Sequence, residues 1–178
     1  MILTMNRIFL IGYMGSGKTT VGQLLASRLG YNFIDMDTHI ERKQLKSVNQ
    51  IFVEQGEQKF RQLEKQSLHE IADFDHVVIS TGGGTPCFFD NMKYMNEQGV
   101  SIYLKLSTEE LAERLESTHA NKRPLLGERK GEELLRFIRD GLAIREPYYL
   151  QARYSISGNI ESAVTHICEL IEKNKCID

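Results

Sequence analysis

The sequence predicts an α/β protein in which helices flank a five-stranded parallel β-sheet. Short apolar runs alternate with longer helical segments along its 178 residues, and strands separated by helices form right-handed units with parallel strands. A glycine-rich segment follows the first apolar run and opens a helix, an arrangement suited to binding phosphate groups. The apolar fraction of 41% and the charged fraction of 26% are those of an ordinary globular domain.

The five segments expected to be strands are short, and most are apolar enough to be covered on both faces. They are residues 7–11, 31–35, 77–81, 101–106 and 154–157. The expected helices show apolar residues at helical spacing or recognisable ends, such as Gly30 after the stripe of Val21 and Leu25. They are residues 19–29, 37–45, 57–73, 89–98, 108–116, 132–145 and 160–173, with 48–56 joining two of them.

Residues 12–19 match G-x-x-x-x-G-K-[ST], the phosphate-binding loop or P-loop. Its glycines let backbone N–H groups approach phosphate oxygens, and the following helix presents its positive end to the anion. Lys18 can reach the β and γ phosphates, and the Thr19 hydroxyl can ligate Mg²⁺. The alternative is a glycine-rich turn that happens to carry a surface lysine.

Two carboxylates follow the second expected strand. If the segment is extended, alternation puts Asp35 and Asp37 on one face, beside the P-loop at the carboxyl ends of the strands. One of them can hold Mg²⁺, through water, and the other can accept hydrogen bonds from a polyol. A pair of solvated aspartates in a turn is the alternative.

Three further features belong to the same edge of the sheet or to a helix near it. Gly82–Gly84 follows an apolar strand and suits close approach of a ligand, or is simply a flexible turn. Arg61 and Glu64 lie one helical turn apart. They either form an ordinary surface ion pair, or Glu64 holds the Arg61 guanidinium in position to bind a substrate carboxylate. Arg145 could contact a substrate or cap the end of its helix.

The polar segment 117–131 is expected to be a mobile loop. It carries Lys122 and Arg123, and a cationic loop opposite a phosphate site suits a lid that excludes water and brings Arg123 to the transferring phosphoryl group. A solvated basic loop is the alternative.

Charge and cysteine usage narrow the possible partners. The net charge of −2 gives no electrostatic case for nucleic acid or an anionic membrane, and no apolar run is long enough to span a bilayer. The three cysteines, Cys87, Cys168 and Cys176, are odd in number and lack metal-site spacing, which favours free thiols in a reducing cytoplasm. Nothing demands more than a monomer, so a monomer is expected.

The motifs taken together resemble the shikimate kinases along almost the whole chain. The matching segments are G-x-M-G-S-G-K-T-T at 12–20, F-I-D-M-D at 33–37, G-E-x-x-F-R-x-x-E at 56–64, T-G-G-G at 81–84, R-P-L-L at 123–126 and R-x-P-x-Y at 145–149. The resemblance implies the P-loop NTPase fold of the nucleoside monophosphate kinase type. It also implies one kinase domain over residues 1–178, with a substrate-binding insert at about 37–65 and a lid at about 117–131.

The activity implied is transfer of the ATP γ-phosphoryl group to the 3-hydroxyl of shikimate, giving shikimate 3-phosphate and ADP on the route to chorismate and the aromatic amino acids. The resemblance assigns Asp37 to the shikimate hydroxyls and to activation of the attacking one. It assigns Arg61 and Arg145 to the shikimate carboxylate, and Gly83 to a backbone contact with the substrate. Asp35 supports one Mg²⁺ through water, with Thr19 as ligand, and Arg123 reaches ATP from the lid. The residues implied to cradle the ATP phosphates are Gly15, Ser16, Gly17, Lys18, Thr19 and Thr20.

Two other functions compete with this one. A gluconate kinase or a nucleoside monophosphate kinase would share the first part of the chain, but two arginines suit a carboxylated acceptor and no second base pocket is apparent. A nucleotide-dependent switch or binding module would keep the P-loop without needing an acceptor site or a cationic lid.

Overall fold

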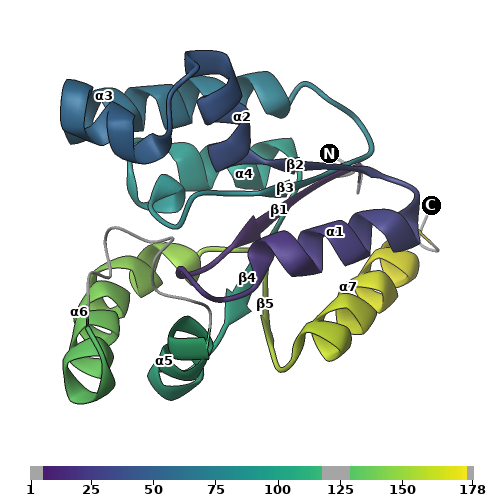
Figure 1. The fold of residues 1–178 in the computed structure, drawn as a ribbon. Helices are drawn as coiled ribbons and strands as arrows, with labels where there is room; N and C mark the ends of the chain where they lie inside the picture. The colour runs from purple at the N-terminus through teal and green to yellow at the C-terminus, as the bar shows by residue number, and fades with distance from the viewer. Residues whose placement is uncertain (1–5, 118–128, 176–178) are drawn as a thin grey trace.

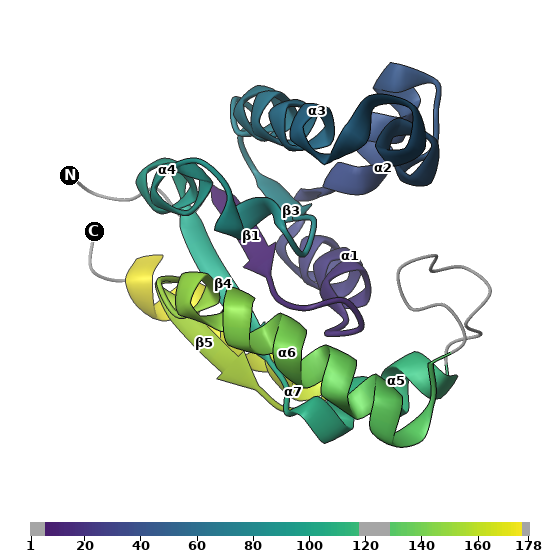
Figure 2. The same cartoon turned by 90° about the vertical axis from the view of Figure 1, so that its left-hand side faces the viewer.

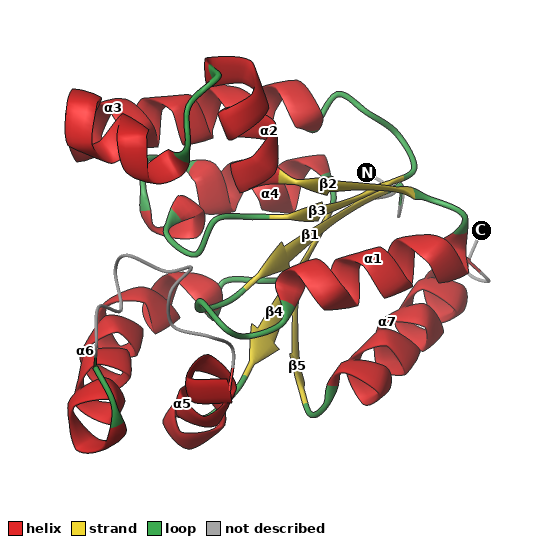
Figure 3. Cartoon of the chain, viewed as in Figure 1, coloured by secondary structure: helices red, strands yellow, loops and turns green. Residues whose placement is uncertain are grey.

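Five parallel strands form one sheet in the computed structural model, which describes residues 6–117 and 129–175 (Figure 1; strands are yellow in Figure 3). The strand order is β2-β3-β1-β4-β5, so that β1 lies at the centre, with Phe9 level with Ile79 on one side and Ser101 on the other. This confirms the predicted α/β class. The strands are β1 (Arg7–Ile11), β2 (Asn32–Asp35), β3 (Val77–Ser80), β4 (Val100–Lys105) and β5 (Tyr154–Ser157).

Helices cover both faces of this sheet. Ile8 and Leu10 of β1 pack against α1 (Lys18–Leu29) and α7 (Ile160–Lys175), while Phe9 and Ile11 point to the opposite face. Alternate residues therefore belong to two separate cores, as expected for a strand buried on both sides. The opposite face is covered by α2 (Met36–Gln44), α3 (Val48–Ile71), α4 (Asn91–Gln98), α5 (Thr108–Ser117) and α6 (Gly131–Tyr149).

The helices of this second face form two groups. In Figures 1 and 2, α2 and α3 lie on one side of the carboxyl end of β1, and α5 and α6 lie on the other. The P-loop between β1 and α1 lies between these groups (Figure 2). This arrangement brings together segments that are far apart in the sequence.

One expected joining segment is helical instead. Residues 48–56 were expected to link two helices, but α3 begins at Val48 and runs through a kink at Gly56, where φ is 79° and ψ is 169°. A reciprocal capping box between Ser47 and Gln50 starts the helix, and Ile51 is fully buried. The local cap and the buried apolar contact together favour a helix here.

Two helix ends also differ from the prediction. The last turn of α6 includes Pro147 and continues to Tyr149, four residues beyond the expected end at Arg145. Tyr149 is fully buried, so tertiary packing holds this turn although Pro147 lacks an N–H. A short 3₁₀ turn, η1 (Thr85–Cys87), precedes α4, which begins at Asn91 and not at residue 89.

None of the helices in the described parts of the chain has both the length and the apolar character needed to cross a membrane.

Candidate active site

A cavity of about 1280 Å³ lies where the strands β1, β2 and β3 end, between the two groups of helices. Nearly all of the residues singled out from the sequence line it. They are Gly15, Gly17, Lys18, Thr19, Thr20, Asp35, Asp37, Arg61, Gly83 and Arg145. Ser16 is buried within the P-loop, and Arg123 lies outside the described residues. This placement agrees with the rule that ligands bind beyond the carboxyl ends of parallel strands.

The P-loop has a backbone that glycine favours. Gly15 and Gly17 adopt φ values of 83° and 91°, and Gly17 is the N-cap of α1, whose first residues line the cavity. Lys18 donates hydrogen bonds to the carbonyls of Gly12 and Tyr13, at 2.8 Å and 3.0 Å. The lysine therefore spans its own loop and places its charge at the edge of the cavity.

Asp35 and Thr19 bring two oxygen ligands together. The Thr19 hydroxyl donates to Asp35 Oδ2 at 2.9 Å, while Oδ1 of the same carboxylate accepts from the backbone N–H of Thr38 and caps α2. Hydroxyl and carboxylate oxygens are ligands that suit Mg²⁺, which usually takes its remaining ligands from water and phosphate. The chemistry of this pair therefore fits a magnesium ion carried with a nucleotide.

Asp37 reaches the cavity from a helix and not from an extended segment. Because Asp35 caps α2, the helix begins at once and Asp37 occupies its first turn, so the expected alternation along a strand is wrong. Asp37 is nevertheless open to the cavity. Its protein surroundings, followed by the charges of Glu64 and Asp35, raise its pKa to about 6, and Lys18 opposes them. A carboxylate of this pKa is a stronger proton acceptor near neutrality than an ordinary aspartate.

Arg61 is held by two carboxylates and an aromatic ring. Its Nη1 donates to Glu64 at 2.6 Å, its Nη2 donates to Glu57 at 2.9 Å, and its guanidinium lies 4.2 Å from the centre of the Phe88 ring. Burial alone would lower the pKa of Arg61, but the charges and hydrogen bonds of Glu64 and Glu57 raise it. The guanidinium is therefore a fixed positive group at the cavity wall.

Glu64 connects Arg61 to the 3₁₀ turn that follows β3 and the glycine loop. Only 1% of Glu64 is exposed, and the Thr85 hydroxyl donates to its Oε1 at 2.6 Å. A buried carboxylate is tolerated when its oxygens are paired in this way. The pair of Arg61 and Glu64 thus lines the cavity and is largely buried, so it is not a plain surface pair.

The three glycines of Gly82–Gly84 allow close packing. A Cβ on Gly82 would lie 2.6 Å from Glu64 Oε1, and one on Gly84 would lie 2.5 Å from Arg61 Nη1. A Cβ on Gly83 would meet nothing closer than 3.6 Å, and Arg145 Nη1 would lie at 3.7 Å. The loop therefore fits between the two arginines because side chains are absent from it.

Arg145 projects from α6 toward the P-loop. Its guanidinium lies 5.3 Å from the centre of the Tyr13 ring, which is itself almost completely buried. This is a cation–π distance, and it places the arginine between the glycine loop and the phosphate loop. The alternative that Arg145 merely caps its helix is wrong, because α6 continues beyond it to Tyr149.

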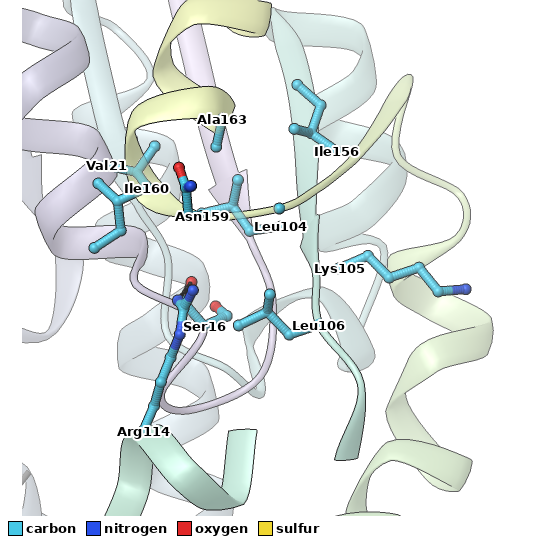
Figure 4. Close-up of a pocket in the computed structure, with 11 residues that line it drawn as sticks. Ser16, Val21, Leu104, Lys105, Leu106, Arg114, Ile156, Asn159, Ile160 and Ala163 are labelled. Carbon is cyan, nitrogen blue, oxygen red and sulfur yellow. Dashed lines mark hydrogen bonds between the residues drawn. The ribbon is translucent and has the colours of Figure 1, made fainter. Parts of the chain in front are cut away.

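Sequence reasoning missed Arg114. A second cavity of about 10 Å³ lies behind the P-loop, and Arg114, Ser16 and Asn159 lie around it (Figure 4). Arg114 reaches from α5 to the carbonyl of Ser16 at 3.3 Å, and it also lines the large cavity with Asn159. Nothing in the pattern of α5 distinguishes this arginine from its charged neighbours, and only the fold brings α5 beside the start of α7.

Comparison with known proteins identifies the family. Residues 14–174 match the family model described as shikimate kinase. The shikimate kinase of Parabacteroides distasonis is 53% identical over 161 residues, which cover 90% of this chain and 91% of that protein. The chain belongs to the shikimate kinase family.

Solved structures of this family have the same fold. The crystal structure of shikimate kinase from Bacteroides thetaiotaomicron has a TM-score of 0.89 and 45% identity, covering 95% of this chain and 99% of the other. The structure of the Acinetobacter baumannii shikimate kinase, solved in complex with shikimate, has a TM-score of 0.86 and 36% identity, covering 98% and 97%. The predicted shikimate kinase family, P-loop kinase fold and ATP-dependent kinase class are confirmed.

Proposed function

We propose that this protein transfers the γ-phosphoryl group of ATP to the 3-hydroxyl of shikimate, giving shikimate 3-phosphate and ADP for chorismate and aromatic amino-acid synthesis. The observation that carries the proposal is the pairing of two binding regions in one cavity. Arg61, Arg145 and the Gly82–Gly84 loop line it together with the P-loop. A carboxylated acceptor and a triphosphate would therefore meet in one cavity, as phosphoryl transfer requires.

On the nucleotide side, the backbone of residues 15–20 would surround the phosphates and Lys18 would turn from the loop carbonyls to the transferring group. Thr19 would ligate Mg²⁺, and Asp35 would support it through water. When bound with ATP, Mg²⁺ neutralises part of the charge on the β and γ phosphates. Arg114 of α5 and Asn159, which directly precedes α7, line the same cavity and would contact the adenine.

On the acceptor side, Arg61, Arg145 and the backbone of Gly83 would bind the shikimate carboxylate. Asp37 would accept a hydrogen bond from the 3-hydroxyl and take its proton as the new P–O bond forms. The raised pKa of Asp37, which desolvation by the surrounding protein and the charge of Glu64 cause, supports this role. Residues 37–65 would then form the acceptor-binding insert of a single domain, and residues 117–131 would form the lid. A monomer in the cytoplasm remains the expectation.

The proposal is tested by ADP release in a coupled assay with MgATP, with and without shikimate. Gluconate and AMP serve as control acceptors, because related kinases of similar fold would use them. We expect strong stimulation by shikimate alone. Stimulation by gluconate or AMP but not shikimate would contradict the acceptor assignment, and ATP binding without turnover on any acceptor would favour a non-catalytic binding module.

Replacing Arg61 with alanine should raise the KM for shikimate by roughly 10- to 100-fold, the value of a lost charged hydrogen bond. The KM for ATP should change little, because Arg61 lies on the acceptor side of the cavity. Steady-state kinetics with each substrate varied in turn measures both. Arg61→Lys is the matched variant, since it keeps the charge that pairs with Glu64 but loses the planar fork. A selective loss of ATP affinity in Arg61→Ala would place the acceptor site elsewhere.

Replacing Arg123 with alanine should slow kcat and leave the KM values for both substrates within a few-fold, because a lid arginine acts mainly on charge that develops during transfer. Single-turnover kinetics at saturating shikimate separates this chemical step from product release. Arg139→Ala, at an exposed position on α6, is the control for a general loss of positive charge. An unchanged kcat in Arg123→Ala would remove this residue from the mechanism.

A further inference from the structure

Tyr149 links the two proposed carboxylate-binding elements. Its side chain is completely buried at the end of α6, and its hydroxyl donates to the carbonyl of Gly83 at 2.5 Å. Arg145 lies four residues earlier on the same helix, so both side chains project from one face. One helix therefore carries an arginine of the site and a tyrosine that holds the backbone beside it.

The hydrogen bond acts at a point where the chain would otherwise be free. Gly82–Gly84 has no side chains, and three successive glycines have more conformational freedom than any other tripeptide. The described structure gives the Gly83 carbonyl a single side-chain donor, the Tyr149 hydroxyl. Burial raises the pKa of Tyr149, so the phenol keeps its proton and remains a donor at physiological pH.

Small movements of this loop would disturb both arginines. A Cβ on Gly84 would lie 2.5 Å from Arg61 Nη1, and one on Gly83 would lie 3.7 Å from Arg145 Nη1. The backbone thus lies against both guanidinium groups with no spare room on the Arg61 side. The distance between these charges depends on where the loop is held.

We propose that Tyr149 is a positioning residue for acceptor binding: its hydroxyl holds Gly83 in register with Arg145, so that both meet the carboxylate of the acceptor together. This inference rests on the proposed function, because it takes shikimate as the acceptor. Tyr149 does not touch the substrate in this account. It acts through Gly83 and through the turn of helix that it shares with Arg145.

The test is Tyr149→Phe, which removes one oxygen and keeps the buried ring. Losing this hydrogen bond and leaving the Gly83 carbonyl unsatisfied should raise the KM for shikimate by about 10-fold, with kcat and the KM for ATP changed less than about twofold. The matched control is Tyr103→Phe. The Tyr103 ring lies 5.2 Å from that of Tyr149, is equally buried, and bonds Glu146 and not the glycine loop. Tyr103→Phe should leave the KM for shikimate unchanged.

An acceptor analogue separates positioning from general loosening of the fold. For shikimate with its carboxylate reduced to a primary alcohol, kcat/KM should be the same in wild type and Tyr149→Phe, because the analogue makes no use of the aligned arginines. An equal loss with both acceptors, or parallel changes in kcat and both KM values, would overturn the positioning role. Wild-type turnover of shikimate is measured first, and its absence would instead overturn the proposed function.

Discussion

Replacing Lys18 with alanine is expected to lower kcat by roughly 10³-fold, within the range seen when one charge-stabilising group is removed from a transition state. In the structure the Lys18 ammonium contacts the carbonyls of Gly12 and Tyr13 at the edge of the cavity. From there its charge is within reach of a phosphoryl group in transfer. Because the charge acts on the moving group, the KM for shikimate should stay within about threefold.

The measurement is steady-state kinetics together with direct binding of shikimate and of ATP. Lys93→Ala is the control, since Lys93 is a well-exposed lysine on α4 with only a surface partner. A variant with unchanged kcat would exclude Lys18 from charge stabilisation. Equal losses in shikimate binding and in kcat would instead show that the alanine had disturbed the cavity as a whole.

Replacing Asp37 with asparagine is expected to lower kcat by roughly 10²- to 10⁴-fold, the usual contribution of a general base. Asparagine keeps the size and the hydrogen-bonding reach of the side chain but cannot take a proton. The substitution therefore distinguishes a base from a group that only orients the hydroxyl. A loss smaller than tenfold would leave Asp37 with an orienting role alone.

The dependence of kcat/KM on pH is an independent test of Asp37 as the general base. Desolvation by the surrounding protein and the charges of Glu64 and Asp35 raise the pKa of Asp37 to about 6, so kcat/KM for shikimate should fall as the pH drops through about 6. The Asp37→Asn variant should lack this fall and keep only its low residual rate. Asp73→Asn is the control, because Asp73 is exposed between α3 and β3, away from the residues that line the cavity. It should retain the wild-type profile.

The same pKa shift predicts the effect on stability. A carboxyl whose pKa is higher in the folded than in the unfolded state binds its proton more tightly when folded, so its contribution to stability is lost as the pH rises from about 4 to about 6. At pH 7 the charged Asp37 therefore disfavours the fold, although water in the cavity screens the effect. Asp37→Asn should have a Tm at pH 7 equal to or above that of wild type. A large drop in the Tm of Asp37→Asn would contradict this prediction. It would also mean that the loss of kcat in this variant results from unfolding.

The local signals in the sequence were sufficient for the fold class and for most of the expected site residues, which do line the cavity. Apolar runs separated by helices determine a parallel sheet, and the P-loop motif determines where a phosphate binds, because both depend on neighbours in the chain. The position of Asp35 and Gly83 at one edge followed from the topology of such sheets, whereas Arg61, on a helix, could not be placed there by this rule. The helix at Val48–Gly56 and the helical turn that carries Asp37 were missed, because a side-chain cap and buried contacts decided them.

Contacts between distant segments are what the tertiary structure alone decided. Sequence spacing could pair Arg61 with Glu64, but only the fold places Thr85 against Glu64, Tyr149 against Gly83, and Arg114 beside the P-loop. These pairs are 21, 66 and 98 residues apart. The sequence by itself determined that the P-loop, Asp35 and the glycine loop reach the cavity, through motif and strand order, but it did not identify Arg114. The tertiary structure decided which side chains pair with the charged residues of the cavity. These partners meet only after the sheet and both helix groups have packed, and no local sequence pattern predicts contacts between segments so far apart in the chain.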